Sequence, residues 1–380
     1  MVSRRGGGLA LVAASLFLAV WASAEKADPQ LRLVKKSSTE RRHRLSRHLA
    51  VDAKAATPTV DLFIRVVPGV KLSQLAASYP RARFRSQAGN VITARVPISL
   101  LPALEADARV RRLHSGQRGR PQLNVVRSNS VTSGYYLGVL QNNNDLAAID
   151  GSGVIVGVVD FTGIDWRHPD FIAAGNNSRI LNIWDQTDNV GPSPTGYYGT
   201  QWTQAQLTDN LQFGSPAIRV TDAVTEGPPG HGSYVTGIAA GNGSGTNGNE
   251  PAGTYAGLAR GADIIFVKAL PFDTAVMDAI QYIVGRAAAL GQRAVINLSL
   301  SFSLGPHDGT SDLDDYVGTI AADTPVAVSA GNHNLDAPHT SFTVGAGATV
   351  VSQVNATTPS GASSTEYIDA DYWYPGTDDY

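Results

Sequence analysis

The sequence predicts an α/β domain with a parallel sheet over residues 151–339, preceded by a small α+β domain over residues 57–115. Near-continuous apolar runs at Val154–Val159, Ile264–Lys268 and Ala294–Leu300 are typical of strands that are buried on both faces. Amphipathic helix patterns lie between these runs. Strands that alternate with helices favour a parallel sheet.

The first 24 residues have the pattern of an export signal. Arg4 and Arg5 provide a positive start, Leu9–Trp21 is an uncharged, mostly apolar run, and Ala22–Ala24 is a small-residue cleavage site. A membrane-spanning helix needs about 20 apolar residues, so we expect a cleaved signal and a secreted, extracellular protein. The absence of cysteine favours a bacterial exporter and excludes a disulfide framework or a Cys nucleophile.

The charge of the chain is divided between its two parts. Residues 1–120 hold 22 Lys+Arg and 7 Asp+Glu, whereas residues 121–380 hold 8 and 25. A basic front fits nucleic-acid or membrane binding, but it also fits a leader that docks on an acidic body. We expect the second arrangement, with no nucleic-acid partner and no membrane span after signal removal.

The segments before the α/β domain differ in pattern. Residues 25–56 are polar and basic without an apolar period, which predicts a flexible linker. Residues 57–115 predict the order β-α-β-β-α-β, from an alternating strand at Val60–Val67 to a last strand at Val110–His114. This order is the split βαβ, or ferredoxin-like, arrangement. Residues 116–150 are a connector.

The α/β domain has its own helix signals and two interruptions. Tyr234–Ala240 and Ala275–Leu290 have helix patterns, and Gly291 ends the second. Pro325–Ser329 reads as a further buried strand. The interruptions are an insert at residues 176–229, rich in Asn, Thr, Gln, Gly and Pro, and the start of a β-rich insert at residues 340–380.

Two residues carry the main signals of catalytic chemistry. Asp160 ends the first buried strand, where ligands of open α/β sheets usually bind, but a turn-forming Asp fits equally well. His231 lies between Gly230 and Gly232 at the start of a helix of small residues. The glycines leave the imidazole open on both sides, as a general base requires between its carboxylate and its nucleophile. The alternative is an exposed loop His.

Asn332 adds a third signal. It follows Val326–Gly331, just past the end of another buried strand. A side-chain amide at that place can donate a hydrogen bond to an oxyanion. A capping Asn after Gly is the alternative.

In this order, an Asp after a Val-rich strand, a Gly-His-Gly at a helix start and an Ala-Gly-Asn after a strand resemble the subtilisin-like serine proteases, or subtilases. The resemblance extends over residues 57–335. It implies that Asp160 orients His231, that His231 is the general base and acid, and that Asn332 helps to form the oxyanion hole. It also implies that residues 57–115 are an inhibitory propeptide.

The resemblance also implies a substrate-binding segment. Ser299, Leu300 and Ser301 are similar to the segment that lines the cleft in the family, although Gly usually stands in place of Ser301. Such a segment binds a peptide as an added β-strand. The implied partners are polypeptide substrates and the protein's own propeptide, docked on the acidic catalytic domain.

The nucleophile of the family follows the oxyanion Asn in a Gly-Thr-Ser-Met-Ala-like helix start. Ser311 precedes Asn332 and is followed by Asp, and no helix pattern follows Ser363, so neither serine fits. The two inserts resemble those of a clostridial-type branch, one of which lies between Asn and Ser. We therefore expect a precursor that is truncated before its nucleophile and is inactive alone.

Two other interpretations stay open. Asp165, His168, Asp170 and His231 carry groups that suit a hydrolytic metal, but they offer no helical i,i+4 ligand pair. We expect no catalytic metal or cofactor; structural calcium is compatible with the resemblance, although no loop has a recognisable ligand spacing. The second interpretation is a non-catalytic, subtilase-like fragment or binding module.

Overall fold

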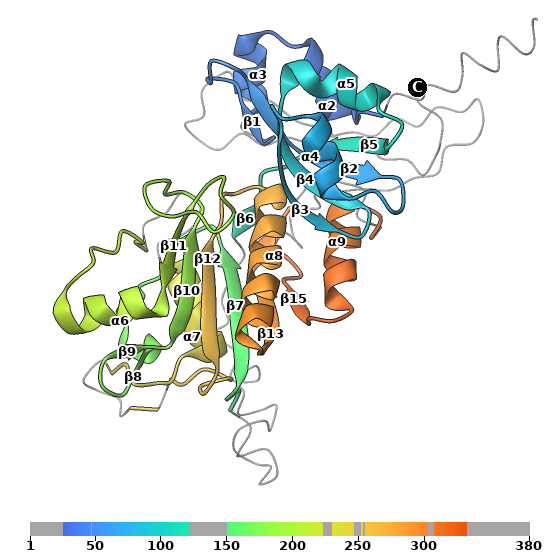
Figure 1. Cartoon of the computed structure of the whole chain (residues 1–380). Coiled ribbons are helices and arrows are strands. Elements are labelled where there is room, and N and C mark those ends of the chain that lie inside the picture. Colours follow the sequence, from blue (N-terminus) through green and yellow to red (C-terminus); the bar gives the residue numbers. More distant parts are fainter. Residues whose placement is uncertain are drawn as a thin grey trace, which may run out of the picture.

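The computed structural model of the chain describes residues 26–46, 48–121, 150–222, 230–246, 252–253, 255–302 and 308–332. An N-terminal α+β domain lies against one end of a larger α/β domain (Figure 1). The expected signal at residues 1–24, the β-rich insert at 340–380 and most of the connector lie outside the described residues. None of the helices in the described ranges combines the length and apolar character needed to span a bilayer.

The N-terminal domain is built on an antiparallel sheet. Its elements are β2 (Thr59–Val66), α4 (Leu72–Ser78), β3 (Arg83–Ala88), β4 (Val91–Pro97), a 3₁₀ turn (Ile98–Leu100), α5 (Leu101–Ala106) and β5 (Val110–Ser115). Strand β4 pairs with β2 and β3, and β5 pairs with β2. The structure therefore has the β-α-β-β-α-β order that the sequence predicts over this stretch.

The expected flexible linker over residues 25–56 is wrong. This segment forms α2 (Pro29–Lys36), α3 (Thr39–Leu45) and β1 (Val51–Asp52). The side chains of Asp28 and Ser38 cap the two helices. Leu31 and Val34 are fully buried in the same apolar core as the N-terminal sheet. The many charges of the segment obscured this i,i+3 pair of apolar residues, which packs α2 against the core.

Leu31 provides a test of this packing. Replacement of Leu31 by alanine is expected to lower the free energy of unfolding by about 2–5 kcal/mol. Leu31 is fully buried, so its truncation leaves a cavity in the core. Urea unfolding measures the change. Leu290→Ala is a control, since Leu290 is 43% exposed and its replacement is expected to change stability by less than about 0.5 kcal/mol. Equal effects of the two changes would contradict the packing of α2.

A six-stranded sheet forms the larger domain. Its strands, in spatial order, are β11 (Thr200–Thr203), β10 (Ile180–Asp185), β12 (Asp263–Lys268), β7 (Val154–Asp160), β13 (Arg293–Leu298) and β15 (Val326–Val328). All neighbours are parallel except β10 and β11. The α/β class with a parallel sheet is thus confirmed. Asp160 pairs with Lys268 and Leu298 with Val328, so the carboxyl ends of four strands share one edge.

Residues 176–229 are not a simple insert in this sheet. They supply β10, β11 and α6 (Gln204–Phe213), and β10 is an interior strand between β11 and β12. Ile180, Ile183 and Trp184 of β10 are fully buried. Polar loops on both sides dominate the composition of the segment, which concealed a short buried strand.

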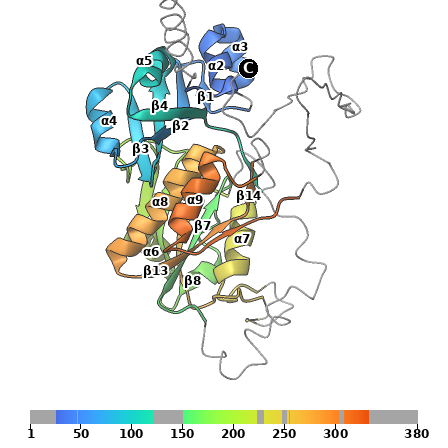
Figure 2. The same cartoon turned by 90° about the vertical axis from the view of Figure 1, so that its right-hand side faces the viewer.

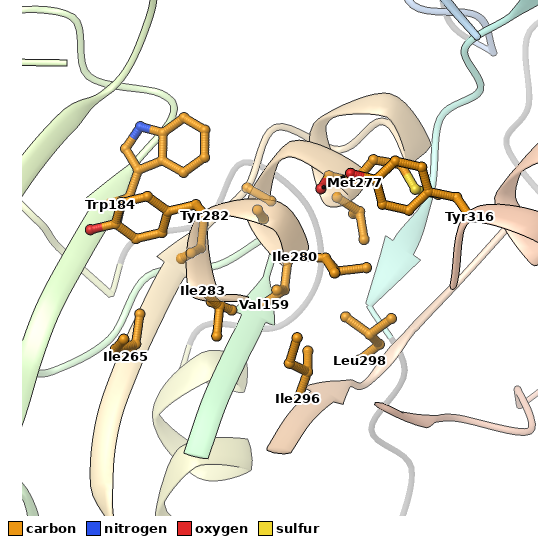
Figure 3. Packing of buried hydrophobic residues seen from close by; sticks show 14 of the residues in the cluster. Val159, Trp184, Ile265, Met277, Ile280, Tyr282, Ile283, Ile296, Leu298 and Tyr316 are labelled. Atoms are coloured by element: carbon orange, nitrogen blue, oxygen red, sulfur yellow. Dashed lines mark hydrogen bonds between the residues drawn. The ribbon is translucent and has the colours of Figure 1, made fainter. Parts of the chain in front are cut away.

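Helices cover both faces of the sheet. They are α7 (His231–Ala240) on one face, with α8 (Asp273–Leu290) and α9 (Asp312–Ala321) on the other (Figure 2). The buried side of α8, with Met277, Ile280 and Ile283, packs on Ile265 and Ile296 of the sheet (Figure 3). Gly291, at φ 66°, ends α8, as the sequence predicts.

The apolar core continues into the N-terminal domain. Phe63, Ala88 and Val91 of that domain are buried in the same cluster as α8 and the parallel sheet. Strands β3 and β4 contact both α8 and α9. The N-terminal sheet is therefore seated on these two helices, as Figure 1 shows.

Asp278 of α8 is the centre of the polar part of this interface. The hydroxyls of Ser86 and Thr93 each donate to Oδ1 at 2.7 Å, and the hydroxyl of Tyr198 donates to Oδ2 at 2.8 Å. The Arg85 Nε lies 3.0 Å from Oδ2, and both side chains of this ion pair are at most 3% exposed. Three of the four partners belong to the N-terminal domain, so one buried carboxylate joins the two domains.

Asp61 holds Arg85 from the other side. Burial opposes ionisation of Asp61, but the guanidinium groups of Arg85 and Arg95 outweigh it and hold its pKa below its usual range. A second ion cluster lies on α9, where Asp312 pairs with Arg65 and with His114 of the N-terminal domain. Basic side chains of the front domain thus meet acidic side chains of the α/β domain.

Candidate active site

Asp160 is the last residue of β7 and is fully buried. The apolar run Val154–Val159 forms the central strand of the parallel sheet, which carries Asp160 to its carboxyl edge. The backbone amide of Thr162 donates to Asp160 Oδ1 at 2.9 Å, and the Thr162 hydroxyl donates to the same oxygen at 3.0 Å. One carboxylate oxygen is therefore fixed, and Oδ2 is left to face His231.

His231 begins α7 and has no exposed surface. Its Nδ1 lies 2.6 Å from Asp160 Oδ2. The structure brings together the two residues that the sequence predicts as an orienting carboxylate and a general base, 71 positions apart along the chain. A carboxylate on Nδ1 holds the imidazole so that Nε2 can accept a proton.

Thr162 connects the two halves of this pair and was missed from the sequence. Its hydroxyl donates to Asp160 and accepts the backbone N–H of Gly232 at 2.7 Å. The start of α7 is thereby tied to the end of β7. The sequence carries no pattern for this role, because a threonine after an aspartate is common and the contact forms only when the helix docks.

Gly232 permits that close docking. A Cβ at this position would lie 2.5 Å from the carbonyl oxygen of Gly163 and 2.8 Å from Phe266 Cζ. Backbone oxygen cannot move aside cheaply, so any side chain would push α7 away from the sheet. The glycine after His231 thus has a specific function: it lets the imidazole reach Asp160.

The surroundings of His231 are acidic. Burial raises the pKa of Asp222 above its usual range, and the neighbouring carboxylates of Asp165 and Asp160 act in the same direction. His231 Nε2 is buried and has no hydrogen-bond partner among the residues that the structure describes. The arrangement can accept a proton from a hydroxyl that approaches Nε2.

Asn332 lies at the same edge of the sheet, four residues beyond β15, and its side chain is exposed. The strand before it is attached to the predicted cleft segment, since Ser329 N donates to Leu298 O at 3.0 Å and Ser329 Oγ to Leu300 O at 2.8 Å. Its expected contact with an oxyanion stays a prediction.

Two of the three predicted substrate-binding residues lie in a short strand. Leu300 and Ser301 form β14, which pairs antiparallel with β6 (Arg120–Pro121), and Ser299 accepts a hydrogen bond from Asn297 at 3.0 Å. The segment that leaves the N-terminal domain therefore lies on this wall. An added-strand mode of peptide binding requires such pairing with extended backbone, and substrate binding by this segment stays a prediction.

A second wall lies on the other side of the same segment. The backbone N–H of Gly119 donates to Pro271 O at 2.9 Å, and Arg118 forms an antiparallel bridge with Phe272. The amide of Gln117 donates to the side chain of Asp273 at 2.8 Å. Residues 117–121 thus lie between two backbone segments, and the sequence predicted only one of them.

The remaining candidates have other roles. Ser311 is the N-cap of α9, where its hydroxyl accepts the amide of Asp314, so its rejection as a nucleophile agrees with the structure. His168 accepts the Asp170 amide at 3.3 Å, and Asp170 Oδ1 accepts the Gly245 amide at 2.6 Å. Within the described ranges, no three His, Asp or Glu side chains gather as metal ligands would.

Comparisons with known proteins agree with this geometry. The model described as "Subtilase family" matches residues 151–374, more than half of the chain. The CspB protease of Clostridium perfringens is 27% identical, with a TM-score of 0.43, over 52% of this chain and 39% of that one. Fervidolysin from Fervidobacterium pennivorans, a keratinolytic enzyme related to subtilisin, is 15% identical, with a TM-score of 0.41, over 72% and 40%.

The epidermin leader peptide processing serine protease of Staphylococcus aureus is 14% identical, with a TM-score of 0.39, over 72% of this chain and 60% of that one. The chain thus spans about two fifths of CspB and of fervidolysin. The family match covers the parallel sheet, Asp160, His231 and Asn332. On that match, the chain belongs to the subtilase family.

Proposed function

We propose that the complete active site of this protein is that of a serine endopeptidase. The observation that carries the proposal is the buried pair of Asp160 and His231, 2.6 Å apart, with the second imidazole nitrogen left to a further group. A carboxylate that orients an imidazole is the arrangement that activates a serine hydroxyl.

The roles follow from this geometry. His231 Nε2 takes the proton of the serine hydroxyl as its oxygen attacks the peptide carbonyl, and then gives that proton to the leaving amine. Asp160 stabilises the imidazolium that forms in between. We assign to Asn332 a hydrogen bond to the oxyanion, a contact worth about 10²–10³ in rate; that figure comes from subtilisin itself. Water then releases the acyl group from the serine.

The serine belongs to residues outside the described ranges. Among the described residues, none hydrogen-bonds to His231 Nε2. Two apolar side chains of the sheet keep exposed surface: Val295 of β13 is 38% exposed, and Val328 of β15 is 59% exposed. These partly exposed apolar side chains of the sheet, together with a His231 Nε2 that has no partner among the described residues, support a proposal in which a further segment packs on the sheet and brings the nucleophile.

We also propose that the N-terminal domain is an inhibitory propeptide of an exported precursor. Its support is the position of residues 117–121 between the two walls of the cleft, together with the basic-on-acidic contacts at α8 and α9. The proposal of export rests on the signal pattern of residues 1–24, and we propose no cofactor beyond the protein's own side chains.

A peptidase assay tests this function. Residues 1–380 alone are expected to hydrolyse a peptide amide substrate no faster than the His231→Ala variant, because the pair alone forms no acyl-enzyme. A form extended to include the nucleophile is expected to hydrolyse it, and His231→Ala is expected to abolish that activity. Hydrolysis by residues 1–380 that is lost in His231→Ala would refute the non-catalytic assignment. Activity of the extended form that survives His231→Ala would refute the protease mechanism.

A further inference from the structure

Gly119 occupies the tightest point of the segment between the two walls. It is buried, and its position is fixed from one side by the hydrogen bond to Pro271 O and from the other by the pairing of the next residue, Arg120, with Ser301. Its φ is not in the left-handed region. Any residue can therefore adopt the backbone conformation at Gly119. Glycine is favoured here only because there is no room for a side chain.

That space is closed by two aromatic rings. A Cβ at Gly119 would lie 2.3 Å from Phe302 Cε1 and 2.8 Å from Phe161 Cζ. The two rings stack edge to face, with centroids 6.3 Å apart. Phe302 is partly exposed and could turn away, but Phe161 has no exposed surface and belongs to the apolar core. Movement of Phe302 alone therefore would not make room for a side chain.

Phe161 is also the residue after Asp160. Its backbone is held by the strand end that positions the catalytic carboxylate, and Thr162 beyond it is bonded to both Asp160 and Gly232. Displacing the Phe161 ring would thus disturb the residues that orient His231. The rigidity of the active site makes the contact at Gly119 rigid too.

We propose that Phe161 and Phe302 form a subsite that admits only glycine, so that the cleft binds extended peptides with a glycine at the register of Gly119. This inference rests on the proposed function, because it takes residues 117–121 as a peptide bound in a substrate cleft. The subsite also fixes register: a shift by one position would place the side chain of Arg118 or Arg120 against the rings.

The first test uses amide hydrogen exchange on the chain of residues 1–380. Gly119→Ala is expected to speed exchange of the amides in residues 117–120 at least about tenfold, since overpacking costs about as much as a tenfold change in an equilibrium constant. Gly119→Ala combined with Phe302→Ala is expected to recover part of the protection. Exchange in β2 and β4 is expected to stay unchanged, which shows that the N-terminal domain is folded.

Gly318→Ala is the matched control. Gly318 lies in α9, a Cβ there would meet nothing within 4 Å, and exchange in residues 117–121 is expected to be unaffected. Unchanged exchange in Gly119→Ala would overturn the proposal. Equal exchange in the single and double variants would overturn the part assigned to Phe302.

The second test asks whether the subsite selects a peptide. A blocked hexapeptide with the sequence of residues 116–121 and its counterpart with alanine at position 119 are added to the Gly119→Ala chain. The glycine peptide is expected to bind at least about tenfold more tightly. Binding is read from renewed protection of the Asp273 amide, which donates to Gln117 O at 3.0 Å, and of the amides of β14. Equal binding of the two peptides, or binding of neither, would overturn the proposal. Neither test measures hydrolysis, so its failure leaves the serine-protease proposal standing.

Discussion

Asp278→Ala is expected to detach the N-terminal domain from α8 and to lower the free energy of docking by about 3–5 kcal/mol, the usual cost of removing one partner from a buried ion pair. Asp278 accepts hydrogen bonds from Ser86, Thr93 and Tyr198 and pairs with Arg85; all of these groups are buried except Tyr198, which is partly exposed. Removal of the carboxylate leaves those donors buried with one acceptor fewer. Arg85 retains only the more distant Asp61, at 3.5 Å.

The loss can be located by hydrogen exchange under native conditions. Amides of β3 and β4 are expected to exchange faster in Asp278→Ala, whereas those of β7 and β12, on the far side of α8, are expected to keep their protection. Alanine favours helix, so α8 itself is expected to remain formed. A uniform loss of protection in all four strands would show global unfolding instead and would contradict a role confined to docking.

Asp315→Ala is the matched control at the same interface. Asp315 pairs with Arg65 at 2.5 Å, but its side chain is 45% exposed. An exposed ion pair contributes about 0–1 kcal/mol, so this variant is expected to keep the N-terminal domain docked. Added salt is expected to weaken the Arg65–Asp315 pair more than the buried Arg85–Asp278 pair, because solvent screens only the exposed one. Equal effects of the two replacements would refute the importance assigned to burial.

The sequence predicts the elements of this interface but not the contacts across it. Strand alternation and helix periodicity locate β2, β5 and α8 with boundaries close to those observed. No periodicity shows that Arg85 and Asp278, 193 positions apart, meet in a buried pair. The charge asymmetry between the two parts of the chain predicts that basic residues of the front part meet acidic residues of the α/β domain. Which residues pair with one another is determined by tertiary packing alone.

The candidate site likewise contains residues that the sequence predicts and residues that it does not. Asp160 and His231 could be predicted because each lies where a strand ends or a helix begins. Few residue types can serve as catalytic groups at such positions. Thr162, Phe161 and Gly119 were missed because their roles depend on what packs beside them. The polar segment at residues 25–56 was misread for a related reason: the apolar pair in α2 is small, and only its contact with the N-terminal core stabilises it.

Asp160→Asn is expected to lower kcat by about 10⁴ in any form of the protein that hydrolyses peptides, with little change in KM. The amide that replaces the carboxylate keeps the size of the side chain, but an amide group facing His231 Nδ1 favours the wrong tautomer and cannot stabilise the imidazolium. Asp160 Oδ2 lies 2.6 Å from that nitrogen with no exposed surface, so water cannot substitute for the lost charge.

Asp165→Asn is the control for this change. Asp165 follows the same strand end, but it is exposed, and we assign it no contact with reacting atoms. Its replacement is expected to lower kcat less than about tenfold, since only a distant charge is removed. Comparable losses in the two variants would refute a specific role of Asp160.

The orientation of His231 by Asp160 can also be tested in the chain of residues 1–380 without an activity assay. Nitrogen NMR of the imidazole is expected to show the proton of neutral His231 on Nδ1 in the native chain, because Asp160 accepts it, and a shift of that proton toward Nε2 in Asp160→Asn. Asp165→Asn is expected to leave the tautomer unchanged. A native chain with its proton on Nε2 would contradict the orientation on which the proposed mechanism depends, since Nε2 would then have no free lone pair for the proton of the serine hydroxyl.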